Sequence, residues 1–143
     1  MRLWAAALLL TASPALAQVT DATGARLRLL DKLTGEITDI TLANGASQTV
    51  ARLTVQVDAC RYPADNPTAE AYAHVTVHDV AAAEPVFKGW MVASSPGLSA
   101  LDHPRYDVWV LRCDVPDLVL PEVAPAPEGE EEGAGEATED GNG

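Results

Sequence analysis

Apolar and polar side chains alternate with a period of two through the middle of the chain. Residues 26–30 alternate basic side chains with leucine, and Leu53, Val55 and Val57 alternate with polar residues. Residues 71–79 divide into small apolar side chains on one face and tyrosine, histidine and threonine on the other. Because successive side chains of a strand point to opposite faces, each pattern predicts a strand with one buried face.

Three further strands are predicted from β-branched and aromatic content, over residues 36–42, 86–93 and 106–113. Turn residues between 31 and 35 join the first two strands of the chain. Asn44 and Gly45 form the strongest hairpin signal, because both residue types tolerate a positive φ. We therefore expect a hairpin there, before the strand that contains Leu53. Residues 61–70 contain turn formers and are predicted to be a surface loop.

One short helical turn is predicted over residues 95–101, between the last two strands. Ser95 stands where an N-cap would, Pro96 suits a first helical position, and Pro104 prevents continuation. Longer amphipathic helical patterns are not seen after the N-terminal segment. The predicted fold is all-β, a small antiparallel β-sandwich or partly open barrel of about six short strands.

The N-terminal segment, residues 1–17, has the features of a secretory signal peptide. A positive Met1-Arg2 start precedes an apolar stretch, and Ala15-Leu16-Ala17 is a small-x-small cleavage site. We expect cleavage after Ala17. Neither this stretch nor any later one is long enough for a membrane span, so we expect a soluble exported protein with a single β-domain over residues 18–115.

The C-terminal segment, residues 116–143, is rich in Pro, Ala, Gly and Glu and is predicted to be a disordered acidic tail. The chain has 21 acidic and 9 basic residues, a net charge of -12. The tail holds nine of the acids and no base, so the rest, without Arg2, has 21 − 9 = 12 acids against 8 bases. No basic patch points to a nucleic-acid partner.

Cys60 and Cys113 are the only cysteines, and in an exported chain they are predicted to form a disulfide. In the chain-entropy model, such a bridge stabilises the fold by roughly 4 kcal/mol. A reactive thiol or a metal-binding pair is disfavoured, because neither Cys-x-x-Cys nor a close His-Cys spacing occurs. Cys60 has the opposite parity to Val57, which predicts a bulge or a strand end nearby. Cys113 shares its parity with Trp109 and Leu111, so Trp109 and Leu111 are expected to face the core with the cysteine.

No metal site or cofactor is predicted. His74 and His78 are four residues apart in a β-branched segment, and on a strand this places them about 13 Å apart, too far for one zinc ion. A carboxylate pair could form among Glu36, Asp39 and Asp107, but no spacing selects such a pair over scattered surface charge. Aromatic side chains, with Met91, could line a groove, although in so small a domain they are expected to form the core and its rim.

A serine nucleophile is the catalytic alternative. The loop between the last two strands contains serines, Asp102 and His103. The G-x-S-x-G and S-x-x-K motifs are absent, and turn formation explains the Ser and Pro residues. A hydrolase using Ser95 or Ser99 with His103 therefore stays as the alternative function.

Three segments carry a family resemblance: LDKLTGEITDITL, LTVQVDACRY and, most specifically, FKGWMVASSPGLSALDHPRYDVWVLRC. Over residues 26–113 they resemble an exported bacterial family known as domain of unknown function 2155. The family shares both cysteines and the string matched here at 89–91, 93–96, 98–101, 103–104 and 106–109. The resemblance implies no established activity or catalytic residue. Genes of the family often lie near one for an accessory subunit of respiratory complex I, which is a hint of a partner.

These observations favour a non-enzymatic periplasmic β-domain that binds or stabilises another cell-envelope protein. The expected contact surface lies in the most specific segment and comprises Trp90, Ser94, Ser95, Ser99, His103 and Tyr106.

Overall fold

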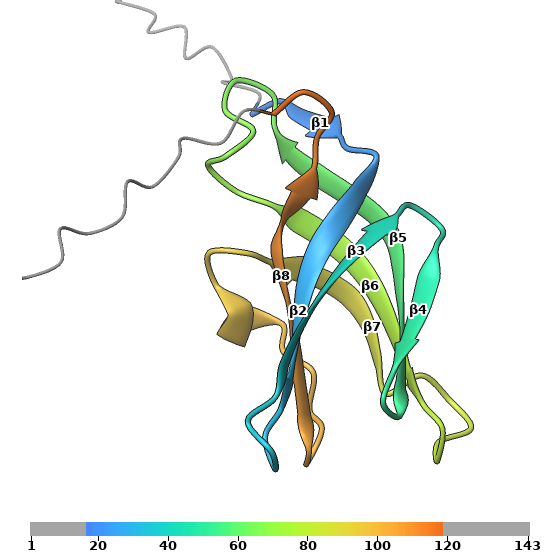
Figure 1. The fold of residues 1–143 in the computed structure, drawn as a ribbon. Helices are drawn as coiled ribbons and strands as arrows, with labels where there is room; N and C mark the ends of the chain where they lie inside the picture. Colours follow the sequence, from blue (N-terminus) through green and yellow to red (C-terminus); the bar gives the residue numbers. More distant parts are fainter. Residues whose placement is uncertain (1–16, 119–143) are drawn as a thin grey trace, which may run out of the picture.

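The computed structural model describes residues 17–118, which form two antiparallel sheets packed face to face (Figure 1). The first sheet contains β1 (Val19–Asp21), β4 (Ser47–Val50), β5 (Leu53–Pro63), β6 (Tyr72–Asp79) and β7 (Phe87–Val92). The second sheet contains β2 (Gly24–Asp31), β3 (Ile37–Ala43) and β8 (Tyr106–Asp114). The all-β prediction is confirmed. Because no strand of one sheet pairs with a strand of the other in this part of the chain, the architecture is a sandwich.

Strand pairing makes β5 the central strand of the first sheet. One of its edges pairs with β6, and β7 lies beyond β6. The other edge is shared by two short strands, β4 opposite residues 53–56 and β1 opposite residues 61–63. In the second sheet β2 lies between β3 and β8. The predicted hairpin between the first two long strands is therefore confirmed as the pairing of β2 with β3.

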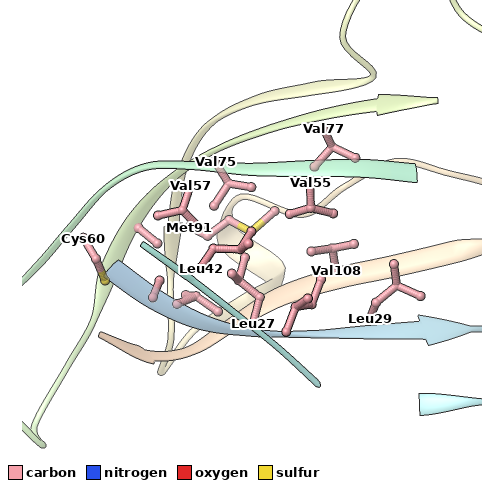
Figure 2. Packing of buried hydrophobic residues seen from close by; sticks show 14 of the residues in the cluster. Leu27, Leu29, Leu42, Val55, Val57, Cys60, Val75, Val77, Met91 and Val108 are labelled. Carbon is pink, nitrogen blue, oxygen red and sulfur yellow. The ribbon is translucent and has the colours of Figure 1, made fainter. Parts of the chain in front are cut away.

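The core lies between the two sheets and is built from alternate strand residues (Figure 2). Val55 and Val57 of β5 and Val75 and Val77 of β6 are fully buried, as their alternation predicts. They face apolar side chains of the second sheet, among them Leu27. Each buried Val or Leu side chain stabilises the fold by about 1.5–3 kcal/mol relative to exposure.

A disulfide joins β5 to β8, and a bulge precedes each cysteine. The Cα atoms of Cys60 and Cys113 are 5.6 Å apart, which confirms the predicted bridge. The pairing of β5 with β6 skips Asp58, and that of β8 with β2 skips Leu111. Each skip turns the following side chains to the other face, so both cysteines point into the core. The bulge expected near Cys60 is confirmed.

The bulge in β8 overturns one prediction about the core. Tyr106, Val108 and Val110 are buried, whereas Trp109 and Leu111 are only half-buried. The predicted parity holds only for a strand that runs without interruption to Cys113. The extra residue at the bulge reverses the parity, so Trp109 does not share the face of the cysteine.

The Asn44-Gly45 turn does not close a hairpin, so that prediction is wrong. Gly45 has the expected positive φ of 81°. The chain, however, passes here from β3 in the second sheet to β4 in the first. The hairpin comes later, where Ala51 and Arg52 join β4 to β5 and Ala51 has a φ of 51°. Alanine rarely adopts a positive φ, which is why the sequence does not reveal this turn.

Some element boundaries also differ from expectation. The chain contains two short strands that the patterns miss, β1 and β4, and β5 continues into the predicted surface loop as far as Pro63. A 3-10 helix at Pro96–Leu98 lies within the predicted helical turn. Ser95 occupies the N-cap position without a side-chain capping bond, and its carbonyl instead accepts the amide of Leu98 at 3.0 Å.

The predicted signal peptide lies outside the described residues except for Ala17, and the predicted tail lies outside them from residue 119 onward. Between residues 17 and 118 no helix has the length and apolar character needed to cross a membrane.

Candidate functional site

A half-exposed tryptophan marks a hollow on the solvent face of the first sheet. Trp90 of β7 is 39% exposed and lines the hollow with Val19 of β1, Arg61 of β5 and Tyr72 of β6. The strand pairing brings these residues together, because Arg61 lies opposite Tyr72, and His74 lies opposite Trp90. The hollow is mainly apolar and has a volume of about 290 Å³.

A second hollow of about 420 Å³ adjoins the first at the β1 edge. Its lining includes Gln18, Val19, Pro63, Asp65 and Tyr72, together with Ala17, the last residue of the predicted signal peptide. Val19 and Tyr72 border both hollows, so together they form one groove across β1, β5, β6 and β7. We call it the Trp90 groove.

Arg61 holds the indole ring of Trp90 from one side. Its Nε donates a hydrogen bond of 2.9 Å to Oδ1 of Asp21, and its guanidinium carbon lies 5.2 Å from the centre of the Trp90 ring. This distance is that of a cation–π contact, which contributes about 0.5–1 kcal/mol at an exposed site. Arg61 therefore supports one side of the ring while much of the ring surface stays accessible.

A hydrogen-bonded network around Asp58 supports Trp90 from another direction. The ring of His74 meets that of Trp90 edge-on, with centres 5.2 Å apart, and His74 Nδ1 lies 2.8 Å from Asp58 Oδ2. Thr76 and Gln56 donate to the same carboxylate at 2.8 and 2.7 Å. Partial burial acts to raise the pKa of Asp58, but these three hydrogen bonds outweigh it and lower the pKa. The bulge at Asp58 also reverses the parity of the residues that follow it, which turns Arg61 to the outer face of the sheet.

Of the six residues predicted to form a contact surface, only Trp90 lies on this groove. Ser94, Ser95 and Ser99 follow β7, and the amide and hydroxyl of Ser94 both donate to the carboxylate of Glu70. Partial burial acts to raise the pKa of Glu70, but the hydrogen bonds from Ser94 and the Ala71 amide lower it overall. Ser94 thus fastens the segment after β7 to the segment before β6.

Tyr106 is buried and His103 is largely covered, so these two members of the predicted contact surface offer little side-chain area in this structure. Tyr106 is 1% exposed, and the side chain of His103 is 11% exposed. His103 Nδ1 lies 3.1 Å from the backbone nitrogens of Arg105 and Tyr106. Because an amide nitrogen can only donate, Nδ1 accepts, and Nε2 carries the hydrogen that Asp79 accepts at 2.9 Å.

These contacts direct His103 away from the serines of the hydrolase alternative in this structure. Both ring nitrogens of His103 are engaged, one by Asp79 and the other by backbone amides. No hydrogen bond within residues 17–118 joins the ring to Ser95 or Ser99. The imidazole is therefore not placed to take a proton from either hydroxyl.

The remaining candidate groups are placed separately. His74 and His78 lie on β6, as predicted. Asp39 pairs with Arg28 at 2.6 Å, and Asp107 pairs with Lys32 at 3.3 Å. In the described part of the chain no three His, Cys, Asp or Glu side chains gather closely enough to hold a metal ion.

The fold and groove define a disulfide-bonded β-sandwich with an aromatic groove on one outer face. The chain belongs to the bacterial family described as "Uncharacterized protein conserved in bacteria (DUF2155)", which matches residues 25–113 and confirms the resemblance. An uncharacterized protein of Rickettsia prowazekii (strain Madrid E) is 26% identical over 100 residues, or 68% of this chain. The match spans 64% of that relative's length. No solved structure gives a significant match.

Sequence reasoning identifies Trp90 but misses the side chains that surround it. It places Arg61 in a loop and Tyr72 on a solvated strand face. The common parity of Tyr72 and His74 is a usable signal for that face. Tyr72 and His74 lie beside Arg61 and Trp90 only because β5, β6 and β7 pair in this order. No local sequence pattern predicts that pairing.

Proposed function

We propose that this protein is a non-enzymatic binding domain of the cell envelope, which holds a protein partner in the Trp90 groove. The supporting observation is that Trp90 stays 39% exposed while Arg61 and His74 hold its ring. Tryptophan, tyrosine and arginine are the residue types that carry most binding energy at protein interfaces. A ring ordered before binding loses little conformational entropy on contact.

Export to the periplasm is part of the proposal. The bridge between Cys60 and Cys113 supports it, because structural disulfides persist in oxidising compartments. Mass spectrometry of the protein from a periplasmic extract should show Gln18 as the first residue and no free thiol. Recovery of an uncleaved protein with reduced Cys60 from the cytoplasm would contradict this part of the proposal.

Crosslinking in cells, followed by affinity capture and mass spectrometry, tests the binding function. A partner captured by the parent should be recovered at least about tenfold less with Trp90→Ala, because truncating a central interface residue typically costs about 2 kcal/mol or more. Lys88→Ala is the matched control, since Lys88 is exposed on the same strand and face. Equal recovery with Trp90→Ala would overturn the assignment of the groove. A partner belonging to respiratory complex I is the narrower form of the proposal.

The non-enzymatic part has its own test. A broad serine-reactive probe should leave the purified protein unlabelled. Labelling that disappears in Ser95→Ala or Ser99→Ala would favour the hydrolase instead.

A further inference from the structure

We infer that residues 119–127 of this chain, VLPEVAPAP, bind in the Trp90 groove and compete there with the partner. The inference concerns the regulation of the proposed binding site, and to that extent it rests on the proposed function. The observation behind it is that β8, which this proline-rich segment follows in the sequence, ends at the same end of the sandwich as the aromatic groove.

The segment has the chemistry that such a groove recognises. It contains Pro121, Pro125 and Pro127, and Glu122 is its one charged residue. Closely spaced prolines favour the extended polyproline conformation, which has no internal hydrogen bonds and loses little entropy on binding. Proline-rich segments of this kind bind grooves that are lined by aromatic side chains. The dense acidic run begins only at Glu128, beyond the segment.

The groove presents matching features along its length. Trp90 and Tyr72 provide aromatic surface, and Pro63 and Val19 provide aliphatic surface. Arg61 of β5 is the cation that Glu122 would meet, through the part of the guanidinium that its Nε bond to Asp21 leaves open. The two hollows have volumes of about 290 and 420 Å³, which together suit a short peptide rather than one side chain.

The chain also leaves the fold within reach of the groove. Cys113 lies 5.6 Å, Cα to Cα, from Cys60, which directly precedes Arg61. The carbonyl of Asp114 accepts hydrogen bonds from the amide and hydroxyl of Thr23, just after β1. Figure 1 shows the end of β8 beside β1 at one end of the sandwich.

The segment is long enough to cross the groove. The groove crosses four adjacent strands, three spacings of about 4.8 Å, or roughly 14 Å in all. Nine residues in the polyproline conformation extend about 28 Å, at about 3.1 Å per residue. Residues 119–127 are therefore long enough to turn out of the fold and cross from Val19 to Trp90.

Limited proteolysis of the mature, oxidised, full-length protein tests the inference, with a protease that cuts after glutamate. The cut after Glu122 lies inside the segment, and the cut after Glu128 lies outside it. Trp90→Ala and Tyr72→Ala should each accelerate the Glu122 cut about tenfold, because a segment bound nine-tenths of the time exposes its bond for one-tenth of it. The Glu128 cut should keep its rate, and Lys88→Ala should change neither.

A second set of variants leaves the folded domain untouched. Replacing Pro121, Pro125 and Pro127 with glycine should accelerate the Glu122 cut as much as Trp90→Ala does. An unchanged melting temperature and an intact disulfide show that any effect of the groove variants is not unfolding. Equal Glu122 rates in the parent and in both groove variants would overturn the inference. Protection that increases with protein concentration would also overturn it, since the occupant would then be the tail of a second copy.

The two proposals can fail separately. If the tail competes with a partner, the triple proline variant should capture more of that partner than the parent does. Protection of Glu122 without any captured partner would leave the tail in the groove and remove the binding function. If Trp90→Ala loses the partner but Glu122 is unprotected in the parent, the binding function stands and the tail is not in the groove.

Discussion

Two buried aspartates show how single residues hold the end of the sandwich away from the disulfide. Asp31 accepts hydrogen bonds from Arg105, the shortest at 2.7 Å, and Asp79 accepts the amide of Ala81 at 2.7 Å and the ring of His103. The bonds from Arg105 are the main cause of the lowered pKa of Asp31. The pKa of Asp79 is lowered chiefly by the Ala81 amide and then by His103.

These aspartates should make stability depend on acid pH. Both folded-state pKa values lie below the ordinary value of 3.8, so each carboxylate stabilises the fold above that pH. This stabilisation is lost as the pH falls through the folded-state values. Asp31→Asn and Asp79→Asn should therefore melt well below the parent at neutral pH, and the difference should shrink below about pH 4.

Thermal melts of each variant beside the parent, from neutral to strongly acidic pH, check this prediction. Asp65→Asn is the control, because Asp65 is exposed and should melt with the parent throughout. A difference between Asp79→Asn and the parent that stays constant over the whole pH range would show that ionisation is not the cause.

At the scale of elements, the sequence predicts faces better than neighbours. Alternation identifies the buried faces of β5 and β6, because burial on one side leaves a period of two. It does not say which strands pair, since any strand with a similar apolar face satisfies the same pattern. The positive φ of Gly45 illustrates the limit. A positive φ is needed both in a hairpin turn and in a turn that crosses between sheets. Only tertiary packing decides which of the two turns forms.

Bulges set the second limit on prediction. The bulge near Cys60 is predictable, because Val57 and Cys60 are both expected to be buried, although residues three apart on a regular strand face opposite sides. Leu111 gives no such sign, so the predicted orientation of Trp109 is wrong. The groove depends on these same features, since pairing and the bulge at Asp58 place the partners of Trp90. This is why the sequence leads to one groove residue and not to the groove.

The crossing turn between the sheets should depend on glycine at one position. Gly45→Ala should lower the free energy of unfolding by about 1–2 kcal/mol, because a Cβ is unfavourable in the left-handed region. Gly97→Ala is the matched control: a Cβ at either position would meet no atom within 4 Å, but only Gly45 has a positive φ. Urea unfolding compares the two variants. Equal losses would mean that φ is not what selects glycine at Gly45.

Across the whole molecule, the disulfide links the two sheets at the end that holds the groove. Cys60 belongs to β5 and Cys113 to β8, and Arg61 of the groove directly follows Cys60. The chain that continues toward residues 119–127 directly follows Cys113. One covalent bond therefore fixes the sheets to each other, the position of Arg61, and the point where the C-terminal segment leaves the fold.

Loss of this bond should weaken both the fold and the groove. Cys60→Ser with Cys113→Ser should lower the free energy of unfolding by roughly 2–5 kcal/mol, because the unfolded chain regains the entropy that the crosslink removes. This is a large share of the total stability of a small domain, about 5–15 kcal/mol. Urea unfolding should place the midpoint of the variant well below that of the oxidised parent. The reduced parent should match the variant, and reductant should not affect the variant itself. If the variant and the oxidised parent unfold at the same urea concentration, the crosslink is not what holds the two sheets together.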